Sequence, residues 1–413
     1  MRRAKHLTLA AALALMLLPS ALPAGPAHAV ETASPEWQAT LAAARNQSVQ
    51  FHAWGGSPNI NDFIAWAGGV VRDRFGITLN HVKLEDTATA VSAIVAEKAA
   101  GRLQGGSVDL VWINGENFAS LKEQGLLADG FATELPNWRY VDTINPGITT
   151  DFTLPIEGQE SPWGRAKLVF FYDSARTAEA DLPPSTADLM TFAKAHSGRF
   201  SYPAPPDFVG SSFLKQVLLE QVADSSLLER PVDEATFASV TAPLWAYLDA
   251  LKPLLWRGGR DFPANYPAMK QLLADGELDI IFAFNPGEAS AGIAAGELPD
   301  TVRSFTFAGG TLGNTHYVAI PFNSGSQAAA KVVADFLLSP EAQLRKEDPA
   351  HWGDPTVLDM AKLPQPERAA FEGLDLGPAT LRASELGPVL SEPHPSWMTR
   401  LEAEWMKRYG TGR

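Results

Sequence analysis

A chain of 413 residues with a formal net charge of −14 and no cysteine excludes several classes of protein. The acidic surface disfavours nucleic acid or an anionic membrane as a partner, and the missing cysteine excludes disulfides, thiol catalysis and a lipid-modified N-terminal cysteine. The length exceeds what one hydrophobic core usually supports, so we expect two lobes, and a content of 46% hydrophobic and 19% charged residues is typical of a globular chain.

The N-terminal 29 residues have the composition of a secretory signal. A basic start is followed by an apolar run at 7–18 that is too short to span a bilayer, and Ala27-His28-Ala29 matches an A-x-A cleavage site. We therefore expect a signal peptide that is removed after Ala29 and a mature chain in the periplasm or secreted outright. No later apolar run approaches about 18 residues, so no further membrane-spanning segment is expected.

Strands and helices alternate through the first part of the mature chain. Apolar and aromatic runs predict strands, and apolar residues spaced three and four apart predict helices. Gly55-Gly56-Ser57-Pro58 follows the first strand as a sharp turn, and Asn61 or Asp62 can cap the helix after it. We expect a mostly parallel, doubly wound sheet whose strand ends open onto one crevice. The expected elements are strands at 49–54, 77–84 and 108–113 and helices at 63–75, 87–100 and 116–124.

Residues 128–165 interrupt this alternation and are rich in Pro, Asn, Gly and aromatic residues. The apolar run 168–172 reads as a strand that carries the chain into a second lobe, and 315–320 reads as the strand that returns it. The other expected elements are helices at 185–198, 211–222, 234–256, 265–273 and 326–338, strands at 278–284 and 301–307, and an amphipathic segment at 396–409. The expected domains are a signal peptide at 1–29, a first lobe at 30–168 and 310–345, a second lobe at 169–309, and a Pro-rich, partly helical C-terminal segment at 346–413 that packs on the lobes.

Familiar enzyme signatures are missing from the sequence. It has no G-x-x-x-x-G-K-[ST] phosphate loop, no G-x-S-x-G turn and no H-E-x-x-H pattern, and the histidines of the mature chain show no i to i+4 pairing. We therefore expect no metal and no cofactor. A secreted hydrolase or lyase on a two-lobed scaffold remains open as an alternative, with Asp207, Asp261 or Glu288 as general base, since distant carboxylates can meet in any fold. A sensor or chaperone-like binder is a third alternative.

Polar, glycine-containing turns recur where the predicted strands end. Turns at the carboxyl ends of parallel strands present free N–H groups and Asn or Ser side chains to one crevice, and two facing crevices form a clamp. Trp54 and Trp163 lie beside such turns and suit a ring-bearing or cationic solute, whereas Trp112 and Phe284 are expected to be buried in the sheet. The turns lie at 54–57, 114–117, 209–212, 285–288 and 313–314.

Five stretches make the chain resemble the solute-binding proteins of bacterial ABC importers, most closely the YnjB-type branch. They are HAWGGSPNINDFIAW, DLVWINGENFASLKEQGLL, SPWGRAKLVFFYDSA, IIFAFNPGEASAGI and YVAIPFNSGSQAAAKVVADFLLSPEAQ. The resemblance implies an α/β, two-lobed periplasmic binding protein-like fold of type II, with hinge crossings between lobes that each contain a mostly parallel sheet. It also implies capture of a small solute without chemistry, so the chain is not expected to be an enzyme.

The resemblance further implies which residues hold the solute. The implied ligand-binding residues are Trp54, Gly55, Gly56, Ser57, Asn114, Glu116 and Asn117 of the first lobe, Trp163 near the crossing, Ser211, Ser212 and Asn285 of the second lobe, and Asn314 and Tyr317 beside the return strand. The expected partners of this monomer are the solute, an ABC permease and its ATPase subunit. A thiamine-like or polyamine-like cation is favoured by the aromatic residues, by Glu116 and Glu288, and by the negative net charge. The tyrosine pairs of iron-binding relatives are not visible, which disfavours ferric iron.

Overall fold

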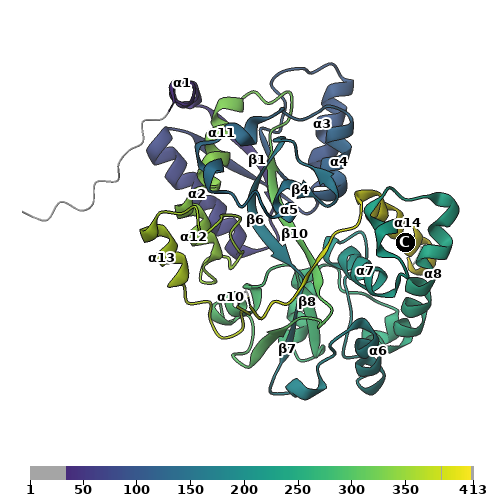
Figure 1. Cartoon of the computed structure of the whole chain (residues 1–413). Coiled ribbons are helices and arrows are strands. Elements are labelled where there is room, and N and C mark those ends of the chain that lie inside the picture. The colour runs from purple at the N-terminus through teal and green to yellow at the C-terminus, as the bar shows by residue number, and fades with distance from the viewer. Residues whose placement is uncertain (1–33, 383, 411–413) are drawn as a thin grey trace, which may run out of the picture.

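The computed structural model describes residues 34–382 and 384–410, which form two lobes, each with a sheet covered by helices (Figure 1). The predicted signal peptide at 1–29 and its cleavage point lie outside the described residues. In the ranges that the structure describes, no helix combines the length and the apolar character needed to cross a membrane.

The sheet of the first lobe is built on strand β1 (Ser48–Trp54). Its neighbours β2 (Thr78–Leu84) and β3 (Leu110–Ile113) both run parallel to it, as the alternation of strands and helices predicts. Two further strands extend the sheet in the opposite direction: β10 (Thr311–Ala319) pairs antiparallel with β3, and β6 (Glu160–Lys167) pairs antiparallel with β10. The carboxyl ends of the three parallel strands therefore lie at one edge of the sheet.

Helix α2 (Pro58–Phe75) begins five residues before the position expected from the sequence. Pro58 occupies the first turn, where its missing N–H costs no hydrogen bond. Asn61 is not the cap, because its side-chain Nδ2 donates to the carbonyl of Gly55 at 3.0 Å. Gly76 ends the helix with a left-handed φ of 71°, and its N–H donates to the carbonyl of Arg72. The face turned to the core carries Ile60, Phe63, Ile64, Ala67 and Val71.

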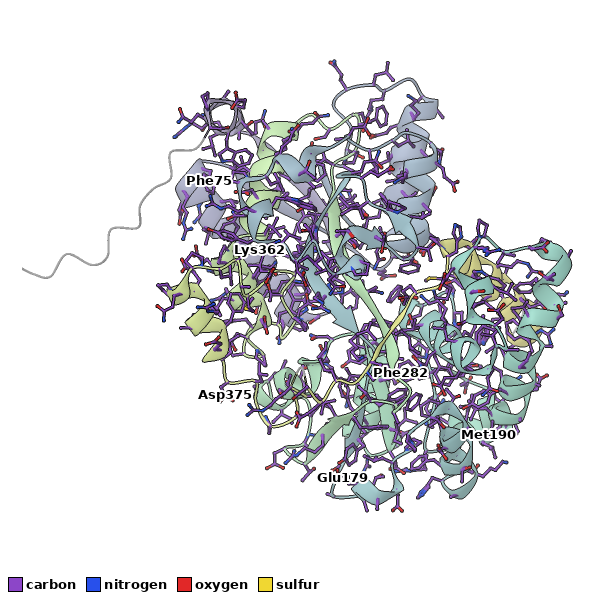
Figure 2. The ribbon with its side chains drawn as sticks, viewed as in Figure 1. Phe75, Glu179, Met190, Phe282, Lys362 and Asp375 are labelled. Atoms are coloured by element: carbon purple, nitrogen blue, oxygen red, sulfur yellow. The ribbon has the colours of Figure 1, made fainter. Side chains whose placement is uncertain are left out.

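The second lobe has a smaller sheet around strand β7 (Val169–Asp173). Both of its neighbours, β8 (Ile280–Ala283) and β9 (Val302–Phe305), are antiparallel to it, so the expectation of a mostly parallel sheet is wrong for this lobe. The strand directions follow from where the chain enters and leaves this lobe. Strand β7 runs away from the first lobe, whereas β8 and β9 both run toward it. The ring of Phe282, labelled in Figure 2, lies in the core of this lobe, where it packs against Phe170 and Phe213.

Three passages of chain connect the two lobes (Figure 1). The first runs from β6 into β7 at Leu168, and the second runs from β9 into β10. The third is the C-terminal segment, whose helices α12 (Pro340–Glu347) and α13 (Gln365–Glu372) pack on the first core and whose helix α14 (Pro395–Tyr409) packs on the second. Between them, β11 (Val389–Ser391) pairs with the start of β10. The exact lobe boundaries stay a prediction.

The remaining elements cover the sheets or form short connections. The stretch expected to be irregular contains β6, and helix α8 ends at Leu251 rather than near 256, where short 3-10 turns follow. The other helices and strands are α1 (Pro35–Ala44), α3 (Ala88–Ala99), α4 (Gly115–Glu123), α5 (Pro146–Thr149), β4 (Thr150–Asp151), β5 (Leu154–Pro155), α6 (Thr186–Ala195), α7 (Phe208–Gln221), α8 (Glu234–Leu251), α9 (Tyr266–Ala274), α10 (Glu288–Ala294) and α11 (Gln327–Leu337). The 3-10 helices are η1 (Phe131–Glu134), η2 (Pro136–Tyr140), η3 (Glu179–Asp181), η4 (Ser225–Glu229), η5 (Lys252–Leu254) and η6 (Trp256–Gly259).

Candidate functional site

A cavity of about 510 Å³ lies between the lobes. The first lobe contributes the ends of β1, β2 and β3 and the starts of the helices that follow them. The second lobe contributes the starts of α7, α9 and α10, the end of β8, and one side of α14. The volume is sufficient for a small organic molecule, and a solute there would touch both lobes at once.

Trp54 and Gly56 form one wall of this cavity at the end of β1. A Cβ atom on Gly56 would lie 2.2 Å from the ring of Trp54, so the ring lies directly over this glycine. Gly55 is similarly crowded by the side chain of Lys83, at 2.7 Å from a Cβ atom placed on it. Glycine at position 56 leaves room for the indole ring, and glycine at position 55 leaves room for the side chain of Lys83, which explains the pair of glycines after the strand.

Carboxylates dominate the polar lining. Among the described residues that line the cavity, six carry a carboxylate and one, Lys270, carries an amine. The Nζ of Lys270 lies 3.3 Å from Glu288 and 2.5 Å from Glu297, so its charge is already compensated. The cavity is therefore electrostatically negative. The carboxylates are Glu85, Asp86, Glu116, Asp207, Glu288 and Glu402.

Glu116 is the least compensated of these acids. Burial is the main cause that raises the pKa of its carboxyl group to about 7; the charges of Glu402 and Asp86 act in the same direction, and a backbone hydrogen bond and Lys215 act against it. Its Oε1 accepts a hydrogen bond from Nδ2 of Asn117 at 2.8 Å, whereas its buried Oε2 has no partner among the described residues. A positive group beside this oxygen would favour the ionised form.

Asp207 combines a structural and an electrostatic role. It is the N-cap of α7, and its Oδ1 accepts hydrogen bonds from the N–H groups of Val209 at 2.9 Å and Gly210 at 3.2 Å. Burial raises the pKa of this carboxyl group to about 6, because these two hydrogen bonds only partly offset the loss of water.

The floor of the cavity is aromatic. The ring of Trp112 lies 4.9 Å from the ring of His316 and 5.6 Å from that of Trp352, and all three residues line the cavity. Beneath them, Nζ of Lys346 lies 4.0 Å from the Trp352 ring centre and pairs with the buried Asp354. Nδ1 of His316 lies 3.4 Å from Asp354, so the imidazole is held against the floor.

Part of the predicted site is brought together in this cavity. Gly55 is next to the lining residues without being one of them. The predicted residues that line the cavity are Trp54, Gly56, Ser57, Asn114, Glu116, Asn117 and Asn285. They come from three different strand ends and from both lobes, and their contact with a solute stays a prediction.

Besides Gly55, five predicted positions lie outside the cavity lining. Trp163 is fully buried, with its ring 5.1 Å from Trp112 and 5.3 Å from Trp352. The hydroxyl of Tyr317 is also buried and donates to main-chain carbonyls of the segment 148–150. Trp163 belongs to the apolar core of the first lobe, and its strand β6 pairs with β10, which carries Tyr317.

The other three positions have polar partners of their own. Asn314 donates from Nδ2 to Glu392 at 3.0 Å, and Ser212 donates from Oγ to the carbonyl of Phe208 at 2.7 Å. Ser211 donates from Oγ to Oε1 of Glu402 at 2.6 Å, so it contacts a carboxylate of the cavity rather than the cavity itself.

Several lining residues were not predicted as ligand contacts. The sequence suggested Asp207 only as an alternative general base, and Glu288 as such a base and as support for a cationic solute. The third candidate base, Asp261, is exposed, pairs with Arg257 and does not line the cavity. Trp352, Met398, Thr399 and Glu402 come from the C-terminal segment. Nothing in the local sequence signals their position, because the contact between Ser211 and Glu402 joins residues 191 positions apart.

A metal site is not apparent in the described part of the chain, where no three histidine, cysteine or acidic residues are placed to hold an ion together.

Comparison with known proteins identifies relatives over most of the chain. Residues 72–361 match the family model described as bacterial extracellular solute-binding protein. Protein YnjB of Escherichia coli K12 is 50% identical over 381 residues, which cover 92% of this chain and 95% of that protein.

Solved structures share the same two-lobed fold. The periplasmic binding protein AfuA from Actinobacillus pleuropneumoniae, solved with fructose-6-phosphate, has a TM-score of 0.62 at 13% identity and covers 88% of this chain and 99% of its own. A putative spermidine/putrescine ABC transporter protein from Listeria monocytogenes has a TM-score of 0.61 at 15% identity and covers 89% of this chain and 99% of its own. At this level of identity the match establishes the α/β periplasmic binding protein fold alone.

Proposed function

We propose that this chain, which belongs to the family of bacterial extracellular solute-binding proteins, captures a small organic cation in the cavity between its lobes. Family membership makes it the periplasmic solute-binding component of an ABC-type importer and not an enzyme. The alternative of a secreted hydrolase or lyase is thereby set aside. The identity of the solute is the open question, and the chemistry of the cavity bears on it.

The observation that carries the proposal is the excess of carboxylates over cationic side chains in the cavity. Of the described residues, six acids line it, and the one lysine among them is paired with Glu288 and Glu297. Placing ionised carboxylates together in a partly buried space is unfavourable unless a positive charge joins them. A cationic solute supplies that charge, whereas an anion would add to the repulsion and a neutral sugar would leave it unchanged.

The aromatic floor narrows the class further. Trp54, Trp112 and Trp352 present ring faces or edges to the cavity, and a cation over such a ring gains roughly 0.5 to 2 kcal/mol. A flat heteroaromatic cation of the thiamine type would use both the rings and the acids. A polyamine would use mainly the acids, so the two subclasses differ in their expected dependence on the tryptophans.

Capture follows from contact with both lobes. A solute that touches the β1 and β3 turns on one side and Asn285 on the other stabilises the closed form by its preference for that form. Moving an equilibrium from mostly open to mostly closed requires about 5.5 kcal/mol of such preference, which a few hydrogen bonds, an ion pair and an aromatic contact supply together. The closed protein would then dock on an ABC permease with its ATPase subunit. We propose export by the signal peptide at 1–29 and action as a monomer.

The experiment starts from the natively purified protein. Native mass spectrometry weighs any molecule that it carries, and calorimetric titration of the ligand-free protein with thiamine, spermidine, fructose-6-phosphate and glucose compares the charge classes. We expect binding of at least one of the two cations and of neither other compound. Binding of the anion or the sugar without either cation would overturn the proposal.

A further inference from the structure

Helices α4 and α14 meet across the boundary between the lobes. Helix α4 belongs to the first lobe, where Phe118 is buried against the sheet. Helix α14 belongs to the second lobe, where Trp397 and Trp405 are buried in its core. Each helix presents one carboxylate to the cavity, Glu116 from α4 and Glu402 from α14. The two acids therefore face the same space from opposite lobes.

Among the residues that the structure describes, neither carboxylate has a cationic partner of its own. Oε2 of Glu116 is buried without a hydrogen-bond partner in the described residues. Glu402 is positioned by the neutral hydroxyl of Ser211, at 2.6 Å. Lys215 is the cation whose field reaches both acids, but its Nζ lies 2.7 Å from Glu392 and forms a buried ion pair there.

The charge of Glu402 also acts on Glu116. The charge of Glu402 raises the pKa of Glu116 beyond the effect of burial, and the charge of Asp86 raises the pKa of both groups. Because the acids belong to different lobes, closure of the empty protein brings like charges together in a space of low dielectric. Opening separates them and restores water.

We infer that the positive group of the solute is bound between Glu116 and Glu402, and that repulsion within this pair holds the empty protein open until a cation arrives. The inference rests on the proposed capture of a cation and assigns that charge to two residues, one in each lobe. It also gives Ser211 the role of a positioning residue, which orients Glu402 without contacting the solute. Recognition of charge and closure of the lobes are then the same event.

The binding test replaces each acid by its neutral isostere. Thiamine and spermidine are titrated calorimetrically into the full-length mature protein and into the Glu116→Gln, Glu402→Gln and Glu404→Gln variants. Glu404 is a matched control, since it lies on the same helix, pairs with Arg408 at 2.9 Å and does not line the cavity. We expect the affinity for the bound cation to fall about tenfold or more in the first two variants and to stay unchanged in the third. Unchanged affinity in the Glu116 and Glu402 variants would overturn the inference.

The closure test needs no ligand. The chain has no cysteine, so fluorophores can be attached through Ala99→Cys on α3 and Ala238→Cys on α8, which lie in different lobes (Figure 1). We expect a shorter distance between the dyes in ligand-free Glu402→Gln and Glu116→Gln than in the labelled parent or in Glu404→Gln.

The two tests separate the inference from the proposed function. If the parent bound neither thiamine nor spermidine, the proposed capture of a cation would be wrong for both compounds. The placement of the solute's positive group between Glu116 and Glu402 would then be wrong as well. The dye distance in the ligand-free variants still tests whether repulsion between Glu116 and Glu402 holds the empty protein open. An unchanged distance in both glutamine variants would overturn that claim.

Discussion

Nζ of Lys215 lies 2.7 Å from Oε2 of Glu392, and both side chains are only 1% exposed. The pair joins helix α7 of the second lobe to the C-terminal segment where that segment passes the hinge strands. The ammonium group also lies 4.6 Å from the ring centre of Phe152 and 5.2 Å from that of Phe208, so it is enclosed by apolar groups apart from its acidic partner. An ion pair in such surroundings depends on both of its members.

Replacing Lys215 by Met should destabilise the protein strongly. The substitution keeps the length of the side chain but leaves the buried Glu392 without its partner, which costs about 3–5 kcal/mol in comparable pairs. Chemical denaturation measures the loss. Lys331→Met is the matched control, because Lys331 pairs with Glu134, which is 63% exposed, and removal of a surface pair costs less than about 1 kcal/mol. Equal losses in the two variants would contradict the structural role of the buried pair.

The double variant Trp54→Ala, Ser57→Ala should weaken solute binding without unfolding the first lobe. Both residues line the cavity, and loss of the indole face removes an interaction of about 1–2 kcal/mol, which is roughly a fivefold to thirtyfold loss of affinity for a ring-bearing cation. Calorimetry measures the affinity and thermal unfolding measures the fold. An unfolded variant whose surviving fraction binds normally would show that the turn is structural only.

Trp163→Ala should instead destabilise the fold rather than act on ligand binding directly. This ring is fully buried among Phe51, Trp112 and Trp352, so its removal leaves a large cavity and should cost about 3–5 kcal/mol of unfolding free energy. Unfolding by denaturant measures the free energy of unfolding of Trp163→Ala and of the Trp54→Ala, Ser57→Ala variant, and the two losses are compared. A stable Trp163→Ala protein that had lost only its ligand would restore this residue to the binding site.

The affinity for a cation should increase as the pH rises from about 5.5 to about 8. The pKa of Glu116 is raised to about 7 in the empty protein, so a cation that pairs with the ionised form must displace a proton below that pH. The charged groups that act on this carboxyl are Asp86, Glu402 and Lys215, and its own charge raises the pKa of the buried Asp151. Calorimetry in buffers of different ionisation enthalpy counts the protons released. Binding that is flat with pH and releases no proton would exclude Glu116 from the contact.

The stability of the ligand-free protein should fall as the pH rises, whereas the affinity for a cation increases. Both effects come from the carboxyl group of Glu116. The carboxyl of Glu116 has an ordinary pKa of 4.5 and a folded-state pKa of about 7. Its contribution to the free energy of unfolding is therefore fully present below pH 4.5 and is lost as the pH rises through 7. Thermal unfolding across this range should show a decline that is smaller in Glu116→Gln. A remaining decline near pH 6 is expected from Asp207, whose pKa is raised in the same direction. An identical pH profile in both proteins would contradict the burial of Glu116.

Much of the architecture follows from local patterns in the sequence. The alternating burial of β1 and the apolar face of α2 are repeats of two and of three to four residues, and such repeats choose strand or helix without reference to the rest of the chain. The same locality explains why the sequence predicts Trp54, Asn114 and Asn285 as neighbours of one crevice, since each lies at or just after the end of a strand that ends at the boundary between the lobes.

Local patterns could not predict the direction of β7 or the depth at which Trp163 lies. Both depend on which strands pair with the crossing segments, and pairing joins residues far apart in sequence, such as Tyr317 and Pro162. A tryptophan beside a glycine therefore faces the cavity in one strand, at Trp54, and the core in another, at Trp163.

By itself, then, the sequence determined a cysteine-free, acidic chain with two α/β lobes and polar turns at its strand ends, because composition and short-range periodicity decide those properties. Only the tertiary structure decided that the C-terminal segment supplies Glu402 and Trp352 to the cavity and that Ser211 serves Glu402 instead of the solute. The physical reason is that α14 is fixed by burying Trp397 and Trp405 in the second core. That burial is stabilised by contacts with distant parts of the chain. Because it fixes α14, it also fixes the position of Glu402.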